Sequence, residues 1–212
     1  MYLPRHFQME SLEAQHALMR RYPFATLVTV SSAGIDANPL PLLLNACRGE
    51  HGVLEGHVAR ANPLCQQPPD HAMALFHGPD SYITPNWYPA KREHGRVVPT
   101  WHYLSIQAHG TLRFIEDTDW LRSHVAELTD RFESDQTAPW SIDDAPAAYI
   151  DGMCRAIVGI EFHIERLAGK HKAAQHKDDA TRQAVHEGFM TAGWDEGRAG
   201  WLSGQTGPER ND

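Results

Sequence analysis

Short β-like segments follow one another at close spacing along this chain, and the helical segments between them are irregularly placed. The chain has 212 residues, enough to bury a packed core. Because the helices do not alternate regularly with the strands, the pattern predicts an α+β protein with a barrel-like antiparallel sheet. The predicted strands are Phe24–Val30, Ile35–Leu44, Val53–His57, Ala72–Phe76, Tyr82–Thr84, Val97–Trp101, Ser105–Ile115 and Ala156–Arg166.

Helices are predicted where apolar residues recur at helical spacing or a capping residue precedes them. The predicted helices are Glu10–Tyr22, Asn62–Gln67, Asp117–Phe132, Ala145–Cys154 and Asp178–Met190, and the link from Ser31 to Gly34 suits a hairpin. From Gly193 onward glycine recurs and apolar residues thin out, which is typical of a flexible segment. We therefore expect one domain over residues 1–190 and a flexible tail over residues 191–212.

Charge and cysteine content restrict the function classes. The net charge of −8 suits DNA phosphates poorly, so direct DNA binding is disfavoured. The three cysteines show no paired spacing, and the fourteen histidines are scattered without a metal-binding motif, so no metal site is expected. No signal peptide is evident, and no apolar run approaches the roughly 18 residues needed to span a bilayer. A soluble cytoplasmic protein is expected.

The stretch Gly56–Pro63 predicts a phosphate-binding turn. It follows a short apolar run, and Asn62 before Pro63 is a typical helix start. Unpaired backbone N–H groups at a helix start favour an anion, and the guanidinium of Arg60 would add a cation beside His57. An ordinary strand-to-helix junction with a solvated arginine would have the same sequence.

Two further segments, Ser81–Pro89 and Val97–Tyr103, are dense in aromatic residues, threonine and proline. Prolines fix the backbone and remove donors, so these segments belong at strand ends, where neighbouring groups are free for a ligand. Half-buried aromatic strand residues would give the same composition. As ligand contacts, the pattern favours a flat heteroaromatic phosphate ester, with candidate residues Tyr82, Thr84, Trp87, Thr100 and Trp101.

Together with the stretches Ala25–Thr29, Leu40–Leu44 and Ile157–Glu161, these motifs resemble the PaiB family. The resemblance runs from about Met1 to Gln183. It implies an FMN-binding split β-barrel like that of pyridoxamine-phosphate oxidases and flavin reductases, with peripheral helices. It also implies a homodimer with FMN between subunits and a role as a negative transcriptional regulator. Within the C-terminal motif of the family, Lys172 and Gln175 match, which makes them candidate cofactor contacts.

Three functions stay open at this point. The first is an FMN-binding protein of PaiB type acting as a flavin-dependent or flavin-sensing regulator. The second is a flavin-dependent oxidoreductase, for which the sequence names neither a substrate nor a catalytic residue. The third is a haem-handling split-barrel protein, suggested by the histidine count.

Overall fold

The structure is a computed structural model that describes residues 1–32, 34–66, 69 and 71–208. Its strands are β1 (Gln8–Met9), β2 (Phe24–Ser31), β3 (Gly34–Pro41), β4 (Leu43–Asn45), β5 (Val53–Ala59), β6 (His71–Ile83), β7 (Thr100–Ile115) and β8 (Ile157–Lys172). Its α-helices are α1 (Leu12–Arg21), α2 (Ala90–Glu93), α3 (Thr118–Glu133), α4 (Ala147–Arg155), α5 (Asp179–Thr191) and α6 (Glu196–Ser203). Short 3-10 turns are η1 (Arg5–Phe7), η2 (Pro63–Cys65), η3 (Pro85–Trp87) and η4 (Ile142–Asp144).

The strands form a sheet in the order β3-β2-β6-β7-β8-β5-β4, and β1 pairs with β8. The pairings β1–β8, β2–β3, β4–β5 and β5–β8 are all antiparallel. This arrangement confirms the predicted α+β class and the antiparallel sheet. The predicted hairpin link at Ser31–Gly34 and the end of the predicted helix at Gln67 include positions outside the described residues.

Two pairs of predicted strands are single long strands in the structure. The segments at Ala72 and Tyr82 are both parts of β6, and β7 runs from Thr100 without a break, so that Val97–Pro99 of the predicted strand precede it. Within β6, the lack of a side chain at Gly78 serves packing, because an added Cβ would meet Leu18 at 2.8 Å and Leu104 at 3.0 Å.

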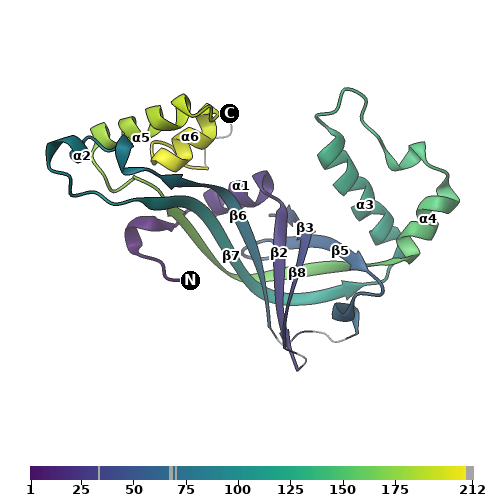
Figure 1. Cartoon of the computed structure of the whole chain (residues 1–212). Helices are drawn as coiled ribbons and strands as arrows, with labels where there is room; N and C mark the ends of the chain where they lie inside the picture. Colours follow the sequence, from purple (N-terminus) through teal and green to yellow (C-terminus); the bar gives the residue numbers. More distant parts are fainter. Residues whose placement is uncertain (33, 67–68, 70, 209–212) are drawn as a thin grey trace. The chain divides into compact units, whose positions relative to one another are not determined.

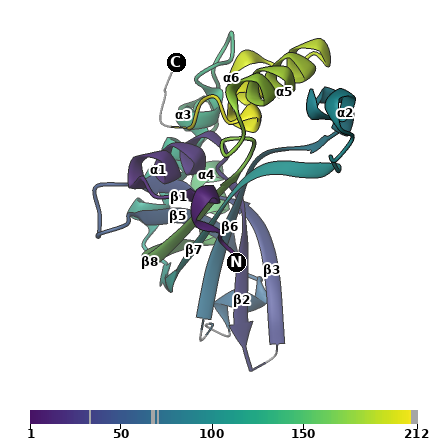
Figure 2. The same ribbon diagram turned by 90° about the vertical axis from the view of Figure 1, so that its left-hand side faces the viewer.

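The described chain divides into two compact units, and β6, β7 and β8 contribute to both. The first unit comprises Met1–Tyr22, Leu75–Gln107 and Leu167–Asp212. Here η3 and α2 connect β6 to β7, and α5 and α6 lie side by side near them (Figures 1 and 2). The buried core of this unit includes Phe76, Ile83, Leu104, Ile106, Phe189 and Leu202.

Helix α6 lies where the sequence suggested a flexible tail. Its N-cap is Asp195, and Leu202 and Ser203 are fully buried. Two histidines bind carbonyl oxygens of its last turn: His102 contacts the oxygen of Leu202 and His171 that of Trp201. Small buried residues and these side-chain bonds hold the helix, so it lacks the regular apolar stripe by which a helix is predicted. Residues 209–212 lie outside the described part.

The second unit comprises Pro23–Ala74 and Ala108–Arg166. Helices α3 and α4 of this unit pack around Leu121, Ile142, Ile150 and Cys154. The indole of Trp120 reaches Gly159 of β8, where no side chain could fit beside it. The predicted helix over Asp117–Phe132 is confirmed as α3, with Asp117 as its N-cap. Figure 1 shows α3 and α4 joined by a long connection.

Gly110 offers a direct test of the strand packing in the second unit. A Cβ at this position would overlap the backbone carbonyl of His163 in β8, and a backbone group cannot move aside as a flexible side chain can. We expect Gly110→Ala to lower the free energy of unfolding by roughly 2–4 kcal/mol, measured by urea denaturation. Gly152→Ala in α4 is the matched control, because an added Cβ there would lie 3.8 Å from the Arg155 guanidinium and alanine favours a helix. Equal effects of the two changes would contradict the close approach.

Candidate functional site

An aromatic surface with two lysines lies on β6, β7 and β8 of the first unit. We call Tyr82, Trp101, Tyr103, Lys170 and Lys172 the aromatic–lysine face. Tyr82 and Trp101 are about half exposed, at 49% and 53%, and their ring centroids are 6.2 Å apart. The Nζ atoms of Lys170 and Lys172 lie 5.4 Å and 5.8 Å from the Tyr103 ring centroid. Lys170 is buried and its Nζ donates to the carbonyl of Tyr2, so Lys172 is the cation of this face that a flat, negatively charged ligand on the exposed rings can reach.

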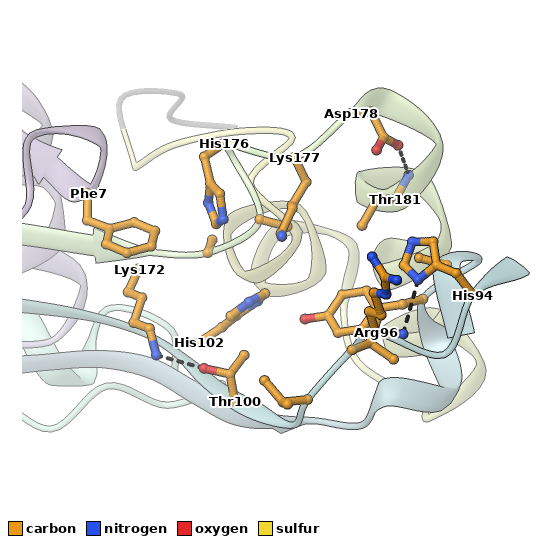
Figure 3. Close-up of a pocket in the computed structure, with 16 residues that line it drawn as sticks. Phe7, His94, Arg96, Thr100, His102, Lys172, His176, Lys177, Asp178 and Thr181 are labelled. Atoms are coloured by element: carbon orange, nitrogen blue, oxygen red, sulfur yellow. Dashed lines mark hydrogen bonds between the residues drawn. The ribbon is translucent and has the colours of Figure 1, made fainter. Parts of the chain in front are cut away.

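The ammonium group of Lys172 is held in place by two oxygen atoms of β7. It donates to the hydroxyl of Thr100 at 2.8 Å and to the carbonyl of Trp101 at 2.9 Å. Figure 3 shows the bond to Thr100. Both partners are neutral, and within the described part of the chain no carboxylate pairs with the ammonium of Lys172.

The other side of β7 carries a buried histidine. Only 3% of His102 is exposed, and its Nδ1 is 2.7 Å from the carbonyl oxygen of Leu202. A carbonyl can only accept, so Nδ1 carries the proton and Nε2 is left with a lone pair. Burial lowers the pKa of His102 to about 4, and the nearby charge of Lys172 acts in the same direction. The imidazole is therefore neutral at neutral pH.

A cavity of about 440 Å³ lies beside His102 and Lys172 (Figure 3). All the residues that line it belong to the first unit. Phe7 and Tyr88 give it aromatic walls, and Lys177 and Arg96 add positive charge. Its volume is within the usual range for small-molecule sites, roughly 300–1,000 Å³.

Three other residues predicted to contact a cofactor in this unit have local structural roles. Thr84 caps η3 by accepting from the N–H of Asn86 at 3.2 Å. The Trp87 ring packs on Phe189, with centroids 5.0 Å apart, and on Gly188 of α5. Both amide atoms of Gln175 bond to nearby backbone groups of its own segment.

The predicted phosphate-binding residues lie in the second unit. Asn62 is confirmed as a cap: its Oδ1 accepts from the N–H of Leu64 at 2.9 Å, although the turn that follows is the three-residue η2 and not a longer helix. The guanidinium of Arg60 donates to the carbonyls of Arg155 and Ile157 and to the exposed carboxylate of Glu116. A phosphate at Arg60 would have to replace Glu116.

His57 forms a pair with a second histidine of this unit. Its Nδ1 lies 3.2 Å from Nε2 of His124, which stacks on Trp120 at a centroid distance of 5.0 Å. Burial lowers the pKa of both histidines, that of His124 to about 4. The pair is stable only while at least one ring is neutral, because one nitrogen must accept the proton of the other.

Sequence reasoning missed His102, Tyr103 and Lys170 as parts of a site. Alternation along the predicted strand could have placed Trp101 and Tyr103 on one side and His102 on the other. Lys170 reaches Tyr103 because β8 pairs with β7, and no pattern of neighbouring residues in the sequence predicts that pairing. Among the described residues, no three His, Cys, Asp or Glu side chains are grouped as a metal site, and no helix is long and apolar enough to cross a membrane.

Comparison with known families gives a match over residues 1–166 to a family described as "Putative FMN-binding domain". The chain belongs to this FMN-binding family. An uncharacterised protein of Emericella nidulans is 31% identical over 85% of this chain and 87% of its own length. One of Aspergillus fumigatus is 32% identical over 69% of each chain. FMN is therefore the cofactor that family membership indicates for this protein.

Solved flavoprotein structures share the fold. The FAD and heme binding protein from Mycobacterium smegmatis superposes with a TM-score of 0.56, at 20% identity over 88% of this chain and 80% of that one. The flavocytochrome Anf3 from Azotobacter vinelandii gives 0.57, at 11% identity over 81% and 73%. These similarities support the predicted split-barrel fold of the FMN-binding family member.

The His57–His124 pair predicts a loss of stability in acid. The unfolded pKa of histidine is about 6.5, and that of His124 in the fold is about 4. The contribution is thus fully present above pH 6.5 and is lost as the pH falls toward 4, by an amount on the order of 2–3 kcal/mol. His124→Phe keeps a ring on Trp120 and removes this titration, so its free energy of unfolding should fall less between pH 7 and pH 4.5. The exposed His71→Gln is the control, and an unchanged slope in His124→Phe would contradict the assignment.

Proposed function

We propose that this protein binds FMN on the aromatic–lysine face of its first unit, with Lys172 at the edge of the flavin ring. The observation that carries the proposal is the fixed ammonium group of Lys172 beside the half-exposed ring of Trp101. Tyr82 and Trp101 offer apolar contact for the ring system, and the hydroxyl of Thr100 is a polar partner at its edge. These residues fit a flavin, which needs flat walls and a few polar groups at its rim.

FMN supplies one- and two-electron chemistry when bound. The contribution of this chain would be electrostatic. A cation beside the pyrimidine edge of the ring lowers the energy of the negatively charged reduced form by Coulomb attraction. The neutral partners of Lys172 leave its charge available for this. Such a site would be compatible with an oxidoreductase activity, and the proposal names no substrate for it.

Independently of the ring contacts on the first unit, Arg60 remains our proposed contact for a phosphate in the second unit. Its Nε and Nη2 atoms are fixed by two backbone carbonyls, so the guanidinium plane is already oriented. The remaining Nη1 pairs with Glu116, whose side chain is 72% exposed, at 2.9 Å. Exposed ion pairs of this kind contribute little, so a phosphate dianion can compete for the position.

The PaiB resemblance adds two further proposals, a homodimer and a regulatory role. The exposed rings of Tyr82 and Trp101 support a second copy of the chain as a cover for the aromatic–lysine face. The regulatory role rests on the resemblance alone. Since the net charge is −8, we expect any such role to act through a partner and not through direct contact with DNA phosphates.

Flavin titration of two variants separates the proposed contacts. Lys172→Ala should weaken FMN and riboflavin alike, by about 10–100-fold, since it removes a charged contact to the shared ring. Arg60→Ala should weaken FMN much more than riboflavin, which has no phosphate. Affinities are measured by quenching of flavin fluorescence at constant ionic strength.

The control for the flavin titration is Lys91→Ala, which removes an equal charge from the exposed helix α2. Wild-type affinity in Lys172→Ala would refute the proposed ring contact. Equal losses of the two ligands in Arg60→Ala would show that this arginine serves the fold through the carbonyls of Arg155 and Ile157.

A homodimer has a mass twice the 23.8 kDa of the chain. We expect light scattering at micromolar concentration to give this value for the wild-type protein. Trp101→Glu puts a charge on the aromatic–lysine face and should shift the mass toward that of the monomer. Tyr149→Glu, at a 59% exposed position on α4, is the matched control. A monomeric wild type would overturn the proposal.

A further inference from the structure

The cavity beside His102 lies on the side of β7 away from the aromatic–lysine face. Trp101 is 53% exposed and His102 only 3%, because successive side chains of a strand point to opposite sides. Phe7, Tyr88 and the connection between β8 and α5 enclose the cavity (Figure 3). Among the five residues of the aromatic–lysine face, only Lys172 also lines it.

Positive charge predominates around this cavity. Lys172, Lys177 and Arg96 line it, and Figure 3 shows Lys177 directed toward the space above His102. Within the described residues, neither Lys177 nor Arg96 has a side-chain ion pair. The acidic residue in the lining is Asp178, and its carboxylate caps α5 by accepting the N–H of Thr181 at 2.7 Å. An anion is therefore the ligand that this charge pattern favours.

His102 adds a specific acceptor to the cavity. Its Nδ1–H is committed to the carbonyl of Leu202, so Nε2 can only accept. Histidines that present a lone pair are commonly fixed in this way, by donation from the other nitrogen to a carbonyl. A ligand with an O–H or N–H group near Nε2 would complete the hydrogen bonding of a ring that is otherwise buried.

Aromatic and apolar side chains supply the remaining walls. The rings of Phe7 and Tyr88 line the cavity together with Val97 and Val98. Flat walls of this kind favour a planar ligand over a branched one. The cations, the Nε2 acceptor of His102 and the aromatic walls together favour an organic anion over a simple inorganic ion.

We propose that this cavity is a second ligand site, next to the proposed flavin site and sharing Lys172 and Thr100 with it, for a small planar organic anion that also carries a hydrogen-bond donor. Arg96 and Lys177 bind the carboxylate or phosphate of the ligand, His102 accepts from its donor group, and Phe7 and Tyr88 contact its plane. The inference goes beyond the proposed function, and it stands whether or not the aromatic–lysine face holds FMN.

Calorimetric titration with three probes tests the proposal. The probes are 4-hydroxybenzoate, which has both an anion and a donor, benzoate, which lacks the donor, and 4-hydroxybenzyl alcohol, which lacks the charge. We expect affinity in the order 4-hydroxybenzoate, benzoate, alcohol, and weaker binding of the two anions at higher salt. Absence of binding by 4-hydroxybenzoate to the wild-type protein would overturn the proposal, as would equal affinity for all three probes.

Two variants assign the binding to the cavity. The double variant Arg96→Ala with Lys177→Ala should lose about tenfold or more in affinity for both carboxylates. Lys91→Ala together with Arg92→Ala removes the same charge from α2, outside this cavity, and should lose far less. His102→Asn should abolish the preference for 4-hydroxybenzoate over benzoate and retain binding of both. Unchanged selectivity in a folded His102→Asn protein would contradict the role of Nε2.

FMN titration of the same variants separates this proposal from the flavin proposal. The cavity double variant should bind FMN with wild-type affinity. If it loses FMN and the carboxylates together, the cavity is the flavin site and the second site is refuted, while FMN binding itself stands. If the wild-type protein binds 4-hydroxybenzoate as expected but no FMN, the proposed function fails and the anion site stands.

Discussion

The alternation of side chains along β7 is the constraint on which both proposed sites of the first unit depend. Thr100 and His102 contribute to the lining of the cavity, and Trp101 and Tyr103 contribute to the aromatic–lysine face. A shift of β7 by one residue against its neighbours would exchange these sets. Lys172 ties the register to β8, because its ammonium binds both the Thr100 hydroxyl and the Trp101 carbonyl. One lysine of β8 thus bonds to β7 and holds the charge that we propose as a ligand contact.

Helix α6, which is distant in sequence from β7, determines the protonated nitrogen of His102 in the cavity. In the last turn of α6 the carbonyl of Trp201 accepts the N–H of Gly204, and the carbonyl of Leu202 lies beyond the intrahelical bonds. His171 adds a second bond to Trp201 and His102 provides the partner of Leu202, and in doing so they dock α6 on the strands. The same bond that satisfies the helix end determines which nitrogen of His102 holds the proton. The hydrogen bond between His102 and Leu202 therefore both holds α6 and leaves Nε2 of His102 as an acceptor.

The residues that match the family model differ from several of the residues in the two proposed sites. The family match ends at residue 166. Lys172, Lys177 and the partner of His102 in α6 all follow that point, so the structure of this chain, and not the family match, shows how they are arranged. Flavin binding is the property indicated for the family, whereas the anion site is argued from contacts in the first unit. The two can accordingly be tested with different variants.

Local signals in the sequence determined much of this protein. Apolar periodicity and capping residues gave α1, α3 and α5, strand patterns gave the antiparallel class, and Asn62 was recognised as a cap. These features depend on interactions between residues close in sequence, so the residue pattern is enough to predict them. Only the tertiary structure showed that α6 docks by histidine bonds and that His102 faces a cavity lined by Lys177. Those contacts join residues up to 100 positions apart, and no local pattern encodes which distant carbonyl a histidine will meet.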